Sequence, residues 1–372
     1  MSWLSNRTFI FFDLLKAGLW GNGNPDIRID ETTDWQEIYR IATEQSVLGL
    51  LLAGLEHSDV KPPKELLLQW IGEVQVIEQR NEAMNGFIAE LIDKLRKNDI
   101  YTILVKGQGV AQCYERPLWR ACGDVDLLLS ESNYIEAKKI LTPLASTVDI
   151  ENKKRKHLGL YFDSWLVELH GTLYTRQLIR LNKVIDEVQH DVFYFGNVRS
   201  WMNGHTTVFL PSPDNDVFFV FAHIIQHYFG GGVGLRQICD WCRLLWSFKD
   251  SINISLLENR LQRAGMTTEW KTFAALAVEY LGMPVEAMPL YSADNRWRKK
   301  ARKVLAFVIK TGNLGHNIDA GYRKKYPFIV WKTISLWRYV RNTVTHLSIF
   351  PKDSIIVLMR MVFTGYNNSP NE

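Results

Sequence analysis

The spacing of apolar residues changes twice along this chain of 372 residues, and this limits the folds that the chain can adopt. From about residue 33 to 98, apolar residues recur at the spacing of amphipathic helices. Short apolar runs of strand length follow between about 100 and 210, beginning with the β-branched and aromatic run IYTILV at 100–105, and they predict strands. Helical spacing then returns from about 212. The sequence therefore predicts an α+β fold with a small mixed sheet and flanking helices.

These changes also predict three parts, and the length allows two or three packed layers. The parts are an N-terminal helical region (1–98), an α/β core (99–211) and a C-terminal helical domain with a basic face (212–372). Strands are expected at 100–105, 124–129, 157–162, 165–170 and 206–210. Helices are expected within 33–98 and at 133–141, 214–229, 235–249, 254–281 and 296–345.

The net charge of +4 is unevenly distributed. Residues 296–341 contain thirteen Lys or Arg against one acid, Asp319, so this segment carries +12 and the remaining chain carries −8. Such a basic region favours binding of an acceptor, a nucleic acid or another polyanion. Because Trp and Tyr are interleaved with the basic residues of 323–341, a membrane-surface contact is an alternative.

The four cysteines are too few for a disulfide framework in a chain of this size. Cys239 and Cys242 form a C-x-x-C motif, but they follow a helical apolar pattern, which favours packing in the core. The N-terminal segment MSWLSNRTFIFFDLLKAGLW has none of the features of a secretory signal. We expect a cytoplasmic protein without a transmembrane segment.

Two acidic residues alternate with apolar residues in the run DVDLLL, which starts at Asp124. Because side chains alternate between the faces of a strand, Asp124 and Asp126 share one face, about 6–7 Å apart along the backbone. A single acid at a strand start often serves as a loop cap. Two carboxylates on one face of an apolar strand repel each other, and this pattern favours a divalent metal site.

A third candidate carboxylate lies in the later run WLVELH, at Glu168. Strand alternation places Glu168 and His170 on the same face of the strand 165–170. If this strand lay at the edge of the sheet, Glu168 could instead be a solvated surface acid. The other interpretation is that Glu168 is the third carboxylate of the metal site.

A glycine-bearing turn, Lys106-Gly107-Gln108-Gly109, stands where the first predicted strand ends and a helix begins. Small residues at such a turn expose backbone N–H groups that can bind phosphate. Lys106 and Arg120 are the cations that we expect near phosphates, because each adjoins one of the predicted strands. Arg116 is more simply explained as a solvated surface charge.

Four segments match a known family in order, over about residues 90–245: LVKGQG, RACGDVDLLL, LVELHG and FAHIIQHYFGGGVGLRQICDW. They resemble the bacterial uncharacterised nucleotidyltransferase family, which is related to minimal and aminoglycoside nucleotidyltransferases. Two features depart from the superfamily pattern. Gln108 replaces the second Gly or Ser of the glycine motif, and the interval to Asp124 is longer than in the minimal enzymes.

The resemblance implies metal-dependent transfer of a nucleoside monophosphate from a nucleoside triphosphate, expected to be ATP, to a hydroxyl-bearing acceptor. It implies Mg²⁺ or Mn²⁺ at a two-metal site, since hard carboxylate oxygens suit these ions. The implied metal ligands and catalytic residues are Asp124, Asp126 and Glu168. The implied nucleotide-binding residues are Lys106, Gly107, Gln108 and Arg120, and the auxiliary residues are His170, His223 and His227.

Two expectations about this site remain open from the sequence. His223 and His227 are four residues apart on one helical face, which permits metal binding, but packing or hydrogen bonding near the site is favoured. The chain could also be a catalytically inactive nucleotide- or nucleic-acid-binding module of the same fold. If Asp124 and Asp126 repel each other, Asn at either position should leave the metal-free protein equally or more stable.

Overall fold

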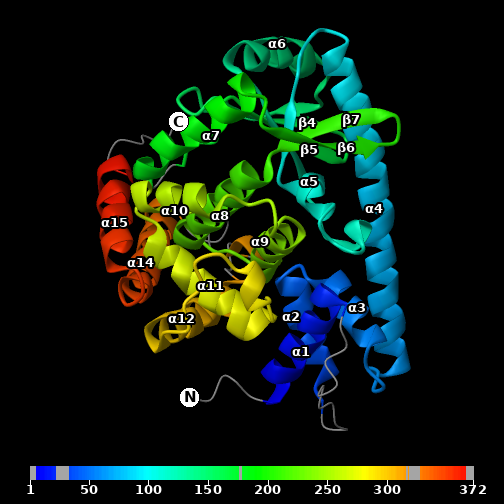
Figure 1. Cartoon of the computed structure of the whole chain (residues 1–372), viewed down its shortest axis with the longest axis vertical. Helices are drawn as coiled ribbons and strands as arrows, with labels where there is room; N and C mark the ends of the chain where they lie inside the picture. The colour runs from blue at the N-terminus through cyan, green and yellow to red at the C-terminus, as the bar shows by residue number, and fades with distance from the viewer. Residues whose placement is uncertain (1–5, 22–32, 176–177, 316, 318–326, 366–372) are drawn as a thin grey trace.

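A computed structural model describes residues 6–21, 33–175, 178–315, 317 and 327–365. Within these residues, seven strands form one mixed sheet in the order β3-β4-β5-β2-β1-β7-β6 (Figure 1). The strands are β1 (Ile103–Val105), β2 (Asp124–Leu128), β3 (Thr147–Val148), β4 (His157–Phe162), β5 (Trp165–His170), β6 (Val198–Asn203) and β7 (Thr206–Pro211).

Helices precede, interrupt and follow the strands (Figure 1). The sheet is preceded by α1 (Asn6–Trp20), α2 (Trp35–Glu44), α3 (Leu48–Glu56) and α4 (Lys64–Arg96). Between strands lie α5 (Gly107–Ala111), α6 (Glu131–Leu141) and α7 (Asn182–Tyr194). The C-terminal helices are α8 (Pro213–Gly230), α9 (Leu235–Ser247), α10 (Ile254–Arg263), α11 (Thr267–Leu281), α12 (Asn295–Thr311), α14 (Phe328–Leu347) and α15 (Pro351–Gly365). The predicted α+β fold with flanking helices is confirmed.

Several elements differ from the prediction. The sequence did not predict α1, α7, β3 or β6, and the single helix expected at 254–281 is two helices. Gly265 separates these two helices with a backbone φ of +63°, a conformation that costs little for glycine and is strained for most other residues. The first strand is also shorter than expected and begins at Ile103.

The two faces of the sheet have different neighbours. Val125 of β2 and Val167 of β5 point to the face that packs against α4 and α6, in a core that also contains Ile88 and Tyr134. The C-terminal half of α4 therefore packs against the sheet. The predicted boundary at residue 98 instead groups this helix with the N-terminal region. That boundary and the one at 211 stay predictions.

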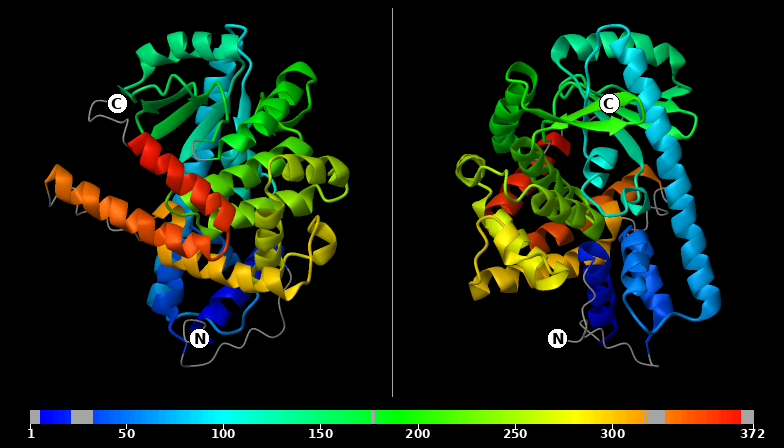
Figure 2. Two further views of the ribbon diagram at one scale, coloured as in Figure 1. Left: turned by 90° about the vertical axis from the view of Figure 1, so that its left-hand side faces the viewer. Right: turned by 45° about the vertical axis from the view of Figure 1, so that its right-hand side comes forward.

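The other face of the sheet meets the C-terminal helices. Val105 of β1 and Leu128 of β2 lie in the core that contains the buried side chains of α8 and α9. Strand alternation places Asp124, Asp126 and Glu168 on this second face. The carboxylates thus lie between the sheet and the C-terminal helices, whose ribbons can be followed in two further views (Figure 2).

The cysteines and the longest uncharged segment behave as the sequence predicts. Cys239 and Cys242 are fully buried in α9, and all four cysteines are free thiols. The segment between Asp216 and Arg236 forms most of α8 and the loop after it. None of the described helices combines the length and the apolar character that a membrane span requires.

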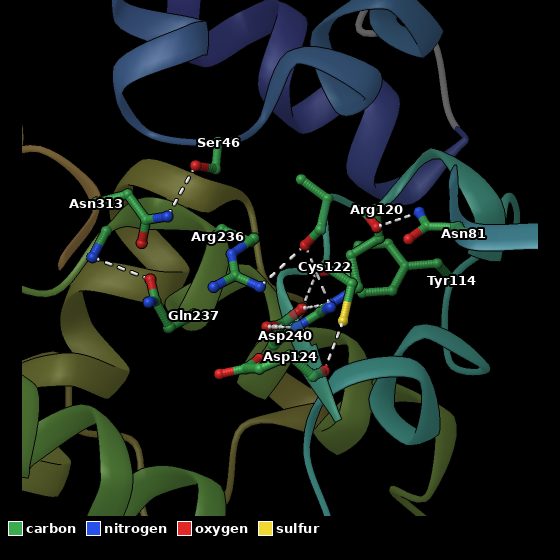
Figure 3. A network of polar contacts seen from close by, with 12 residues as sticks. Ser46, Asn81, Tyr114, Arg120, Cys122, Asp124, Arg236, Gln237, Asp240 and Asn313 are labelled. Atoms are coloured by element: carbon green, nitrogen blue, oxygen red, sulfur yellow. Dashed lines mark hydrogen bonds and ion pairs between the residues drawn. The ribbon is translucent and has the colours of Figure 1, made fainter. Parts of the chain in front are cut away.

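A buried ion pair joins the connection between β1 and β2 to helix α9 (Figure 3). Nε and Nη2 of Arg120 each donate to one carboxylate oxygen of Asp240, both at 2.7 Å. The Tyr114 hydroxyl donates to the same carboxylate at 2.8 Å. Although burial opposes ionisation, Arg120 keeps the pKa of Asp240 below its ordinary value. The pair fixes α9 against the loop that leads into β2.

Candidate active site

Three carboxylates from two adjacent strands line one cavity of about 230 Å³. Strands β2 and β5 are parallel, and their register places Asp126 directly beside Glu168, with Asp124 two residues earlier on the same face. One oxygen from each of the three carboxylates lies within 4.8 Å of the others. The sheet register therefore brings together the three acids that the sequence predicts.

Lys106 reaches this cavity through an unusual backbone conformation. Leu104 faces α4 and α6 and Val105 faces the C-terminal helices, so regular alternation would turn Lys106 away from the carboxylates. The backbone of Lys106 instead has a φ of +59°, and Gly107 follows with +41°. This left-handed turn, rare for a non-glycine residue, directs the lysine side chain into the cavity.

Asp126 is 2% exposed and is neutralised by two nitrogen atoms. Lys106 Nζ lies 2.7 Å from its Oδ1 atom, and His170 Nε2 lies 2.8 Å from the same oxygen. Burial alone would lower the pKa of His170, but its contacts with the carboxylates of Asp126 and Glu168 raise it above the ordinary value. For Lys106, burial is likewise outweighed by the three carboxylates, which raise its pKa.

Asp124 has less compensation. The charge of Asp126, and then burial, raise the pKa of Asp124 above its ordinary value, while Lys106 opposes the shift. The expected repulsion between the two aspartates therefore raises the pKa of Asp124. Three hard oxygen ligands, of which Asp124 is the least compensated, suit a divalent cation such as Mg²⁺, so the residues fit the metal that the resemblance implies.

Glu168 contacts two histidines as well as the cavity. Its Oε2 atom lies 3.2 Å from His157 Nε2 and 3.4 Å from His170 Nε2. Burial favours the neutral acid, but these two contacts hold the pKa of Glu168 well below its ordinary value. His157 was not among the predicted site residues. The two-residue turn Asp163-Ser164 was a usable signal, because it pairs His157 with His170 across the hairpin.

Arg236 is a second site residue that the sequence analysis missed. It occupies the first turn of α9 and lines the cavity together with Asp124 (Figure 3). Its Nη1 atom donates to the carbonyl oxygen of Ala121 at 2.9 Å, and its buried Nε atom has no hydrogen-bond partner among the described residues. The available signal was its position two residues after the Gly230–Gly234 segment, at the start of a predicted helix.

His223 and His227 line the same cavity from helix α8. Their ring centroids are 4.3 Å apart, which follows from their spacing of four residues on one helical face. Burial, reinforced by the nearby charge of Lys106, lowers the pKa of His223 well below its ordinary value and that of His227 to about 4. Both imidazoles are therefore neutral near pH 7 and can donate or accept hydrogen bonds.

The structure brings most of the predicted site residues together. The cavity is lined by eight of them: Lys106, Gly107, Arg120, Asp124, Asp126, Glu168, His223 and His227. His170 lies beside the cavity and contacts two of the carboxylates. Gln108 does not line it, because its buried side chain turns toward α4 and donates to Asn81 Oδ1 at 2.8 Å.

Arg120 reaches the cavity wall, but its guanidinium is already occupied. Two of its nitrogen atoms bind Asp240, and Nη1 lies 3.3 Å from the Ala121 carbonyl oxygen. Phosphate binding by Arg120 stays a prediction. It would compete with a buried ion pair, whereas Arg236 Nε has no partner in the part of the chain that the structure describes, so the contacts favour Arg236 for that role.

The surroundings of Asp124 and Asp126 predict different effects of asparagine. Because the folded protein raises the pKa of Asp124, its ionised form costs stability above about pH 4. Asp124→Asn should therefore leave the free energy of unfolding equal or higher at pH 7, with any gain vanishing below the unfolded pKa. Asp126→Asn should lower it by about 1–3 kcal/mol, since Lys106 and His170 each lose a charged partner.

Urea unfolding of both variants and the wild type in chelator-treated buffer measures these differences. The sequence alone suggested that both variants would keep full stability, and the contacts of Asp126 change that expectation. Equal losses at the two positions would show that repulsion does not govern Asp124.

A comparison with known proteins identifies the family of this chain. A family model described as "Uncharacterised nucleotidyltransferase" matches residues 31–282, which include the whole sheet, the three carboxylates and Arg236. No curated protein and no solved structure matched in the corresponding searches. The match covers more than half of the chain and includes every motif on which the predicted resemblance rests, so the chain belongs to the uncharacterised nucleotidyltransferase family.

Proposed function

We propose that this chain transfers a nucleoside monophosphate from a nucleoside triphosphate to a hydroxyl group of an acceptor, in a metal-dependent reaction. One observation carries the proposal: Asp124, Asp126 and Glu168 converge within 4.8 Å at a cavity that also contains the cations Lys106 and Arg236. Carboxylates that bind divalent cations, next to fixed positive side chains, form the arrangement that phosphoryl chemistry requires.

In the proposed reaction, Asp124, Asp126 and Glu168 hold the metal ions, Mg²⁺ or Mn²⁺. Bound there, the ions would neutralise phosphate charge and lower the pKa of the attacking hydroxyl. Glu168 also lines the cavity, where it could orient that hydroxyl.

Lys106 and Arg236 approach the carboxylates from different elements, one from the end of β1 and the other from the start of α9. This arrangement would hold a triphosphate between the sheet and the C-terminal helices. The cavity of about 230 Å³ is smaller than the roughly 300–1,000 Å³ of pockets that enclose a whole ligand. We infer that it holds the phosphates, while the nucleoside extends outward.

The main alternative is an inactive nucleotide- or nucleic-acid-binding module of the same fold. An inactive module need not keep three carboxylates that repel one another and raise the pKa of Asp124. Their retention at the cavity favours the enzyme. ATP is the expected donor, and the acceptor could be a small hydroxylated metabolite, a protein side chain or an RNA end.

The first test is thermal stabilisation by each of the four nucleoside triphosphates with Mg²⁺ or Mn²⁺, since a ligand that binds only the folded state raises its stability. With the stabilising nucleotide, Glu168→Gln should remove metal-dependent transfer, measured as pyrophosphate release with candidate acceptors. His170→Asn should cost less, because only a carboxylate supplies a negative oxygen ligand to magnesium. If His170→Asn were the more damaging change, Glu168 would not be the third metal ligand.

Arg236 and Arg120 should respond differently to substitution. Arg236→Gln should weaken binding of the metal–triphosphate complex by about 10–100-fold and leave the fold stable, because a charged hydrogen bond to phosphate is worth about 1.5–3 kcal/mol. Arg120→Met should instead lower the free energy of unfolding by about 3–5 kcal/mol, since it leaves Asp240 buried and unpaired.

Calorimetric titration and urea unfolding of both variants separate these roles. Arg116→Gln is a matched control, since Arg116 forms an exposed pair with Glu56 away from the carboxylates. A stable Arg120→Met protein that cannot bind triphosphate would assign the phosphate contact to Arg120.

The basic segment 296–341 is proposed as the acceptor or polyanion surface. Residues 316 and 318–326, with Arg323, Lys324 and Lys325, lie outside the described residues. On α12, Lys300 Nζ donates to the Ile349 carbonyl oxygen, and Lys303 lies near Ser348, so these two lysines bind the end of α14.

Lys299 and Arg302 are exposed on the same helix and are better probes of binding. Replacing both with Gln should weaken binding of single-stranded RNA or heparin at low salt and flatten its salt dependence, because each contact with a phosphate or sulfate releases counterions. Fluorescence anisotropy over a salt series measures this. Unchanged affinity at low salt would remove α12 from the proposed surface.

A further inference from the structure

The imidazoles beside Glu168 form a second group of possible metal ligands. His157 and His170 face each other across the β4–β5 hairpin, with ring centroids 4.8 Å apart. Their Nε2 atoms both lie near the same oxygen of Glu168, and one ligand atom from each of the three residues lies within 4.8 Å of the others. This group shares Glu168 with the carboxylate site and contributes two nitrogen ligands that the carboxylate site does not have.

The distances within this group are those between ligands of one metal ion. Charge-assisted hydrogen bonds between nitrogen and a carboxylate oxygen are about 2.7–2.9 Å long. The distances from His157 and His170 to Glu168 are longer, at 3.2 and 3.4 Å. Metal bonds of about 2.0–2.2 Å in tetrahedral geometry place neighbouring ligand atoms roughly 3.3–3.6 Å apart, and both distances are within about 0.1 Å of this range.

His170 adds a second argument. Its Nε2 atom faces two carboxylate oxygens, at 2.8 Å on Asp126 and 3.4 Å on Glu168, and one N–H cannot point at both. A cation held by this nitrogen would interact with both oxygens at once.

We propose that His157, His170 and Glu168 bind a divalent transition-metal ion, so that the metal centre has one oxygen-rich position and one position with two imidazoles. Two imidazoles and a carboxylate suit zinc, manganese or cobalt, whereas magnesium prefers oxygen ligands alone. The role of this ion as the second metal of the transfer reaction rests on the proposed function, but its binding does not. Glu168 would bridge the two positions.

Metal-depleted protein titrated with Co²⁺ tests the proposal, because cobalt bound to nitrogen ligands in a low-symmetry site absorbs visibly. The wild type should bind one Co²⁺ with this absorption. His157→Gln and His170→Gln should each weaken binding by about tenfold or more, a loss at least as large as that for the outer partners of metal ligands. His205→Gln, which changes an exposed histidine at the β6–β7 turn, should have no effect.

Two further variants make the outcome decisive. His157→Cys should restore Co²⁺ binding with a new sulfur-to-metal charge-transfer band, which a merely misfolded site would not give. Asp124→Asn should keep the imidazole-bound Co²⁺, because Asp124 is not one of its ligands, although triphosphate binding is lost.

A His157→Gln protein that binds Co²⁺ as tightly as the wild type would overturn the inference. The same conclusion would follow if Asp124→Asn alone removed the absorption. If the wild type bound Co²⁺ as expected but no triphosphate stabilised it, the proposed function would fail and the metal site would stand.

Discussion

The register between β2 and β5 brings three carboxylates together, and the other residues of the site are arranged around them. Two parallel strands place Asp126 beside Glu168 and Asp124 on the same face, so three negative charges gather where the C-terminal helices cover the sheet. Such a cluster is costly unless cations accompany it. Lys106 and His170 neutralise Asp126, and two histidines contact Glu168, while Asp124 keeps a raised pKa. A divalent ion bound at these carboxylates would neutralise the negative charge that remains.

The compensating groups come from distant parts of the chain, so the site depends on how the helices pack on the sheet. Lys106 is directed into the cavity by a left-handed turn at the end of β1. Arg236 belongs to α9, whose position is fixed by the buried pair of Arg120 and Asp240 (Figure 3). A change in the packing of α9 would therefore move a cation relative to the carboxylates, even though the sheet itself stayed intact.

Much of this could be predicted because it depends on local spacing. The alternation of Asp124 and Asp126 in an apolar run determines their common face, and the short turn after β4 determines the hairpin that carries Glu168. Helix α1 was missed because its own apolar residues, such as Phe11, Phe12 and Leu14, lie on several of its sides. Its sequence therefore shows no helical period. Strand β6 was missed because it is a partly exposed edge strand rich in polar residues.

The site residues that escaped prediction depend on long-range packing. Sequence spacing cannot show that Arg236 of α9 lies in the same cavity as Asp124, because more than a hundred residues separate them. Nor does it show that Arg120 is occupied by Asp240, since that contact exists only once α9 is in place. Gln108 was expected at the phosphate-binding turn, but burial against Asn81 takes its side chain away from the cavity.

The most direct test of the account is anomalous diffraction from crystals grown with Mn²⁺ and a non-hydrolysable nucleoside triphosphate. The account predicts a manganese peak within about 2–2.5 Å of carboxylate oxygens of Asp124 and Asp126, with triphosphate oxygens in its coordination shell and Lys106 and Arg236 against the phosphates. A triphosphate bound on the basic surface of α12, with no metal between the carboxylates, would contradict it.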